Sequence, residues 1–86
     1  MFTKGTSAWI KDWDTMESEY GLTDEGNIDT DGLLFFPASE KHLCGKEVVI
    51  GYVRDTGAGL LYECFLRDTS EMITFYLTDA ALMLNE

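Results

Sequence analysis

The sequence predicts a mainly β domain of the α+β class: a small, curved antiparallel sheet or barrel of four to five strands, with a short amino-terminal helix and a carboxyl-terminal helical turn. Three observations lead to this prediction. Residues 46–53 are rich in β-branched side chains, residues 54–59 are a glycine-containing connection, and residues 60–67 form a second apolar run. Two such runs joined by a short turn are typical of an antiparallel hairpin, because alternate residues of both can line one core.

The chain is long enough for one domain with one core. Its 86 residues leave no room for a second folded domain. Hydrophobic residues make up 45% of the chain, which is ample for a packed interior. We divide this single domain, residues 1–86, into an amino-terminal helical segment (1–22), an acidic loop (23–32) and a β-barrel body (33–86).

The amino-terminal segment admits two interpretations. Its apolar side chains fall at spacings that one helical stripe can collect: Trp9, Ile10, Trp13, Met16 and Tyr20. In the other interpretation residues 7–11 are extended, and the helix begins after Asp14, which caps it while Glu17 reaches back. We prefer the short helix, residues 14–20, which ends at Gly21. Whether residues 7–13 are strand or helix stays open.

The middle of the chain alternates turns with short strands. Residues 23–32 are turn formers and carboxylates with one isolated apolar residue, so they are expected to form a loop, and residues 33–36 a buried strand. Residues 37–45 begin with proline and end with glycine, which favours a compact turn or a single helical turn.

The carboxyl-terminal part continues the same pattern. Residues 68–71 are expected to form a turn, residues 72–77 a further strand and residues 78–83 a capped helical turn. Curling a sheet of such short strands into a barrel removes most of the edges on which another chain could pair.

The charge of the chain is strongly negative and uneven. Sixteen acidic residues against six basic ones give a net charge of −10, and residues 1–32 hold eight acids and two bases. This charge repels phosphate backbones and anionic lipid, so we expect no direct contact with nucleic acid or membrane. The start of the chain has no secretory signal pattern, and the two cysteines are best explained as buried apolar residues. We therefore expect a cytoplasmic protein.

The body of the chain resembles a group of small proteins encoded by phages and prophages. The resemblance covers about residues 9–86 and rests on Phe36, the run Gly45-Lys46-Glu47-Val48-Val49-Ile50, Tyr62, the run Phe75-Tyr76-Leu77-Thr78-Asp79, and Met83-Leu84. Those proteins are similar to SH3-like β-barrels. The resemblance implies an SH3-like fold, an accessory role in the cytoplasm of a bacterial host, and no activity common to the group.

No residue constellation supports catalysis, so we predict that the protein is not an enzyme and needs no cofactor or metal. Asn27 to Gly32 reproduces the first half of an EF-hand calcium loop, but Ala38 stands where the bidentate glutamate belongs. His42 and Cys44 could form a thiol–imidazole pair, but no orienting group or oxyanion site accompanies them.

The remaining candidate is a binding surface of acids and aromatic residues in the amino-terminal third. A dense group of carboxylates suits a basic partner, and tryptophans can anchor an interface. The alternative is that the aromatic residues pack on the sheet while the acids face water. The candidate binding residues are Asp12, Asp14, Glu17, Glu19, Asp24, Glu25, Asp29, Asp31, Trp9 and Trp13.

These observations predict a non-catalytic phage accessory or inhibitor protein. Its acidic surface would bind a basic site on a host protein that handles nucleic acid, in the manner of a DNA mimic acting against restriction or CRISPR defence. The alternative is a structural or assembly protein that self-associates or joins a phage complex. The sequence leaves the oligomeric state open.

Overall fold

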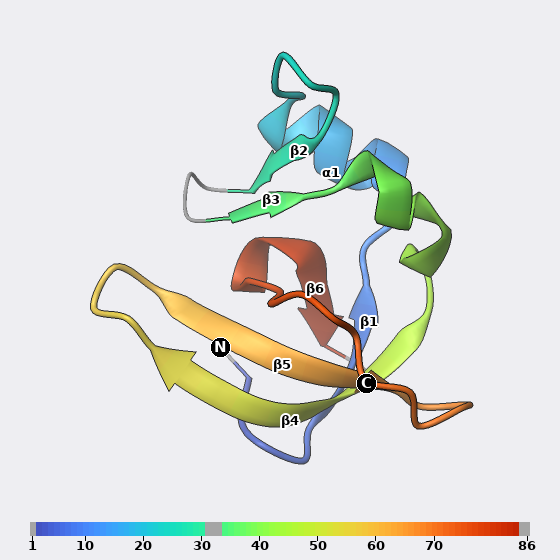
Figure 1. Cartoon of the computed structure of the whole chain (residues 1–86), viewed down its shortest axis with the longest axis vertical. Coiled ribbons are helices and arrows are strands. Elements are labelled where there is room, and N and C mark those ends of the chain that lie inside the picture. Colours follow the sequence, from blue (N-terminus) through green and yellow to red (C-terminus); the bar gives the residue numbers. More distant parts are fainter. Residues whose placement is uncertain (1, 31–33, 85–86) are drawn as a thin grey trace.

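A four-stranded antiparallel sheet forms the body of the protein, in the strand order β5-β4-β1-β6 (Figure 1). The computed structural model describes residues 2–30 and 34–84. The strands of this sheet are β1 (Ser7–Ile10), β4 (Glu47–Asp55), β5 (Leu60–Leu66) and β6 (Leu82–Leu84). This sheet confirms the expected mainly β fold, and the first and last strands of the chain are neighbours in it.

The chain between β1 and β4 leaves this sheet and builds a second layer, at the top of Figure 1. It contains helix α1 (Trp13–Tyr20), the two-stranded sheet of β2 (Ile28–Thr30) and β3 (Leu34–Phe36), and the 3-10 turn η1 (Ala38–Leu43). We call α1, β2, β3 and their connections, residues 11–30 and 34–36, the acidic lobe. The turn η1 confirms the helical turn expected within residues 37–45.

The predicted β4–β5 hairpin is confirmed, and it contains a β-bulge at Gly51. The register is Ile50 opposite Cys64 before the bulge and Tyr52 opposite Glu63 after it. Ile50 and Cys64 both face the core, whereas beyond the bulge it is Val53 that pairs with the buried Tyr62. The extra residue therefore changes which side chains of β4 point inward.

Three predicted elements need correction. The loop expected at 23–32 contains strand β2, because Ile28 and Thr30 are buried when β2 pairs with β3. The helical turn expected at 78–83 is only η2 (Asp79–Ala81), and Leu82 and Met83 belong to β6. Residues 72–77 meet β5 only at bridges from Met72 and Leu77, so they form no regular strand. The described residues contain no closed barrel.

The amino-terminal segment follows the alternative in which the chain before the helix is extended. Residues Ser7–Ile10 form β1, and α1 begins at Trp13 after Asp12, so the cap expected at Asp14 is wrong. Asp12 caps α1 with its backbone carbonyl, which accepts from Met16 N at 3.1 Å, and its side chain makes no capping bond. The predicted helix end is confirmed at Gly21, whose φ of +80° suits glycine.

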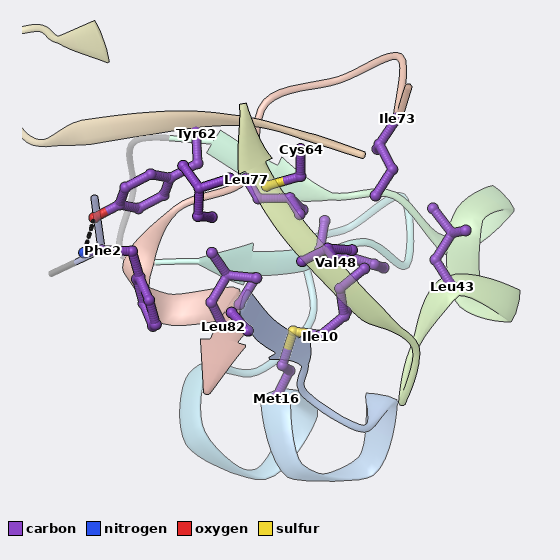
Figure 2. Packing of buried hydrophobic residues seen from close by; sticks show 14 of the residues in the cluster. Phe2, Ile10, Met16, Leu43, Val48, Tyr62, Cys64, Ile73, Leu77 and Leu82 are labelled. Atoms are coloured by element: carbon purple, nitrogen blue, oxygen red, sulfur yellow. Dashed lines mark hydrogen bonds between the residues drawn. The ribbon is translucent and has the colours of Figure 1, made fainter. Parts of the chain in front are cut away.

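The core lies between the sheet and the lobe, and Tyr62 is its largest fully buried side chain (Figure 2). Its ring packs edge-on against Phe2, with centroids 5.6 Å apart. Its hydroxyl accepts from Phe2 N at 3.1 Å and donates to Asp79 Oδ1 at 2.7 Å. Tyr62 therefore connects β5 to the amino-terminal segment and to η2.

Gly51→Ala should destabilise the protein through Phe65. A Cβ at Gly51 would lie 2.2 Å from Cε2 of Phe65, so the ring must move. We expect a loss of about 1–3 kcal/mol in the free energy of unfolding, measured by urea denaturation. In a Phe65→Ala background the same change should cost much less, and an equal cost in both backgrounds would show that the ring is not responsible.

Tyr62 and Cys64 should make the stability fall at alkaline pH. Burial raises the pKa of Tyr62 from 10.0 to about 12 and that of Cys64 from 9.0 to about 12. Both groups keep their protons longer in the folded state, so their contribution is complete below pH 9 and is lost as the pH rises toward 12.

The matching variant is Tyr62→Phe. It should cost about 1–3 kcal/mol at pH 8, because Phe2 N loses its acceptor. From pH 8 to pH 11 it should then lose less further stability than the natural protein, as measured by urea denaturation. Identical pH dependence of the two proteins would contradict the assignment to Tyr62.

Candidate interaction surface

Helix α1 presents its carboxylates to water because its other side is tied to the core. Trp13 and Met16, three residues apart, are buried against the rest of the lobe. Asp14, Glu17 and Glu19 lie at other positions of the helix and are exposed, and Asp12 is exposed just before the helix. The sequence therefore fixes the direction of these acids through the two apolar residues.

The second group of carboxylates lies on the connection after α1 and on β2. Asp24 and Glu25 are exposed in the turn that precedes β2. Asp29 points outward because its neighbours Ile28 and Thr30 point inward, and the Thr30 hydroxyl is satisfied by the carbonyl of Leu34. Asp31 lies outside the described residues.

Seven carboxylates thus lie exposed on the described part of the acidic lobe, against one base, Lys11. Lys11 Nζ is 2.9 Å from Glu19 Oε1 and 5.7 Å from the centroid of the Tyr20 ring. Glu19 is the only one of the seven that forms an ion pair within the described residues. Most of the negative charge of the described part of the lobe therefore faces solvent without an ion pair.

The two tryptophans have different positions. Trp13 is only 8% exposed, and it packs against Phe36 with ring centroids 6.3 Å apart while Lys41 Nζ lies 5.2 Å from its ring. Trp13 therefore belongs to the core and cannot anchor a partner. This agrees with the alternative interpretation of the sequence, in which the aromatic residues pack on the sheet. Trp9 is 38% exposed, but it lies on β1, on the outer face of the main sheet beside Met83. Neither tryptophan is part of the exposed acidic surface.

Sequence reasoning missed Phe35, the aromatic residue that the lobe does expose. Phe35 lies opposite Asp29 in the β2–β3 pair and is 56% exposed, whereas its neighbour Phe36 is buried. Its exposure could have been predicted from the sequence. Successive side chains of a strand point to opposite faces, so the three apolar residues at 34–36 cannot all point inward. Phe35 therefore joins Asp29 on the outer face of the lobe.

The two cysteines and the histidine differ in burial. Burial, followed by the charge of Asp12, raises the pKa of the Cys44 thiol, so it holds its proton at neutral pH. His42 Nε2 lies 3.7 Å from Glu40 Oε2. Cys64 is buried in the core. Cys44 is partly buried and packs against the same core.

The start of the EF-hand-like motif has a structural role. Asn27 Oδ1 accepts from Ala38 N at 2.9 Å, so the Asn27 side chain holds the two ends of the β2–β3 hairpin together. The backbone Asn27 N donates to Thr23 Oγ1 at 3.2 Å. The next three residues, Ile28–Thr30, are extended in β2 and do not coil around a cation, and Asp31 and Gly32 of the motif lie outside the described residues. Within the described ranges, no group of three or more His, Cys, Asp or Glu side chains could hold a metal ion.

Comparison with known proteins found no similarity: no protein-family model, curated protein or solved structure matches the chain. Neither α1 nor any other helix in the described part of the chain has the length and apolar character required to span a bilayer.

Millimolar calcium should leave the melting temperature unchanged, because residues 28–30 form a strand and no carboxylate stands at position 38. The measurement is thermal unfolding in the presence of calcium or EDTA. A cation bound only by the folded protein must stabilise it, so a rise in melting temperature with calcium would contradict this prediction.

Proposed function

We propose that the protein is a non-catalytic binding protein whose acidic lobe presents carboxylates to a basic site on a host protein. The observation that carries this proposal is the group of seven exposed carboxylates on one lobe, only one of which is paired with a cation of the residues that the structure describes. A surface of this kind speeds encounter with a basic cleft and makes binding sensitive to salt, as phosphates do.

The proposed partner is a bacterial protein that handles nucleic acid, and the proposed role is that of a phage-encoded inhibitor that competes with DNA in host defence. A basic cleft selected for phosphates accepts a dense array of carboxylates for the same electrostatic reason. The same charge disfavours direct contact of this protein with nucleic acid or membrane. We place it in the cytoplasm of the bacterial host.

We further propose an SH3-like class for the fold. The support is the order of segments: β1 pairs with the last strand, β6, while β4, β5 and residues 72–77 follow one another as a meander. The 3-10 turn η2 leads directly into β6. The bridges from Met72 and Leu77 bring the segment that precedes η2 and β6 against β5.

One observation favours the alternative of self-association. Trp9 and Met83 are cross-strand neighbours on the outer face of the main sheet, and they are 38% and 44% exposed. Apolar side chains that are adjacent on an open sheet face can pack against another copy of the chain. If this alternative holds, Trp9→Ser should abolish self-association and leave salt-sensitive capture of a host protein unchanged.

The acidic-surface proposal is tested by neutralising four carboxylates of the lobe together. The variant carries Asp14→Asn, Glu17→Gln, Asp24→Asn and Glu25→Gln. Exposed pairs contribute about 0.2–1 kcal/mol each, so the set should weaken capture of the host partner about tenfold or more at low salt. Binding should also fall with added salt and with competing duplex DNA. The readout is the amount of one identified partner retained from a bacterial lysate, followed by its affinity in purified form.

The matched control removes the same number of charges elsewhere. It carries Glu40→Gln, Glu63→Gln, Asp68→Asn and Glu71→Gln, all outside the lobe. This control should retain the partner, whereas equal loss in both variants would mean that only the net charge matters. Binding that survives the lobe variant, or that ignores salt and DNA, would refute the proposal. The melting temperature of the lobe variant should be unchanged or raised, because mutual repulsion is reduced.

A further inference from the structure

The outer face of the β2–β3 sheet places an exposed aromatic ring beside an exposed carboxylate. Ile28, Thr30 and Phe36 are buried on the inner face of this sheet, whereas Asp29 and Phe35 point outward. Phe35 is 56% exposed, although contact between apolar surface and water is unfavourable. The core does not use this ring, so a partner can.

The backbone hydrogen bonds show that Asp29 and Phe35 are close neighbours. Opposite residues of an antiparallel pair either exchange backbone hydrogen bonds or turn these groups away, and the second kind of pair lies closer together. Asp29 N donates to the carbonyl of Gly21 at 3.2 Å, on the side of β2 where Leu22 bridges Ile28. Asp29 and Phe35 are therefore a pair of the closer kind, in which the Cβ atoms are about 4.5–5.5 Å apart.

The charges around this face favour a cationic occupant. Asp29 has no ion pair within the described residues, and Asp24 and Glu25 are exposed in the turn that leads into β2. The base of the lobe, Lys11, is paired with a carboxylate of α1, and Lys41 Nζ of η1 lies 5.2 Å from the centroid of a core tryptophan ring. A cation on a partner therefore meets carboxylates here, whereas an anion is repelled.

The carboxylates and the ring act over different ranges. Exposed carboxylates speed encounter with a basic partner, but salt screens them. Burial of an aromatic ring acts only in contact, and salt does not screen it. Aromatic side chains are frequent among the few residues that carry most of the binding energy of an interface, where polar groups surround them. Phe35 is the residue of this face that can hold a partner after the charges have attracted it.

We propose that the outer face of the β2–β3 sheet binds a segment of the partner protein in which an apolar side chain stands between cations. The apolar group packs on the Phe35 ring, and the cations lie against Asp29 and the carboxylates of the preceding turn. This inference rests on the proposed function, which supplies a basic partner, and adds the apolar group that the partner must present.

The test uses two peptides with blocked ends that differ only in their apolar residues. In the leucine peptide three lysines alternate with two leucines, and in the glycine peptide glycine replaces each leucine. At low salt the natural protein should bind the leucine peptide more tightly, as measured by the shifts of amide NMR signals on titration. The shifts should concentrate at residues 28–30 and 34–36. Glutamate in place of each lysine should abolish binding.

Two variants separate the ring from the carboxylate. Phe35→Ala should weaken binding of the leucine peptide about two- to tenfold and leave the glycine peptide unchanged. Asp29→Asn should weaken binding of both peptides about two- to fivefold, because both carry the lysines. The matched controls, Tyr52→Ala and Asp68→Asn, remove an exposed ring and an exposed carboxylate outside the lobe and should bind both peptides as the natural protein does. Circular dichroism should show every variant folded.

Three results would overturn the proposal. Equal affinity of the natural protein for the two peptides would remove the apolar preference. Equal weakening of both peptides by Phe35→Ala would show that the ring does not contact the leucines. Sedimentation that finds the natural protein dimeric and Phe35→Ala monomeric would make a second copy of the chain the occupant of this face.

Measurements with the purified partner distinguish the failure of this proposal from that of the proposed function. The four-carboxylate variant retains Asp29 and Phe35, and it should lose affinity mainly at low salt. Phe35→Ala should lose affinity by about the same factor, two- to tenfold, at low and at high salt, because salt does not screen apolar contact. Full affinity of Phe35→Ala beside a weakened four-carboxylate variant would contradict the role of the ring alone. Full affinity of the four-carboxylate variant would contradict the acidic-surface proposal, and the two peptides would still decide what the β2–β3 face selects.

Discussion

The bulge at Gly51 is the constraint on which the rest of the fold depends. A strand without a bulge alternates its faces, so Val48 and Ile50 facing inward would turn Tyr52 inward and Val53 outward. The extra residue reverses this order, and Val53 then pairs with Tyr62 on the core side. Tyr62 in turn contacts Phe2 and Asp79, which belong to the two ends of the chain. Because the Phe65 ring fills the space beside Gly51, a side chain at position 51 would have to displace this ring.

The sequence was most informative where local preference and tertiary pairing agree. The β-branched run of β4 and the glycine-rich turn after it predict the hairpin, and the structure contains it. Ile28–Thr30 shows the opposite case, since turn formers surround it and only pairing with β3 makes it a strand. Leu82–Leu84 likewise has no strand preference of its own, and β1 imposes the extended form. The bulge itself could not be predicted, because a glycine in a strand has several possible causes.

In the candidate surface, the positions of the acids could be predicted from the sequence, whereas those of the aromatic residues could not. Acidic side chains are exposed almost wherever they occur, so charge along the sequence was enough to locate the lobe. The aromatic residues needed the fold. Trp13 and Trp9 lie four residues apart, yet one is in the core and the other on the outer face of the sheet, because a strand ends and a helix begins between them. Phe35 is exposed only because β3 pairs with β2, which was expected to be loop.

The acidic lobe is inserted between β1 and β4, two strands that are paired in the main sheet. The lobe contributes to the core mainly through its inward apolar side chains. These are chiefly Trp13, Met16, Ile28 and Phe36. The outward positions of the same helix and strands contribute little to that packing. Carboxylates can accumulate there at the cost of mutual repulsion alone, which salt screens and which the proposed basic partner would relieve.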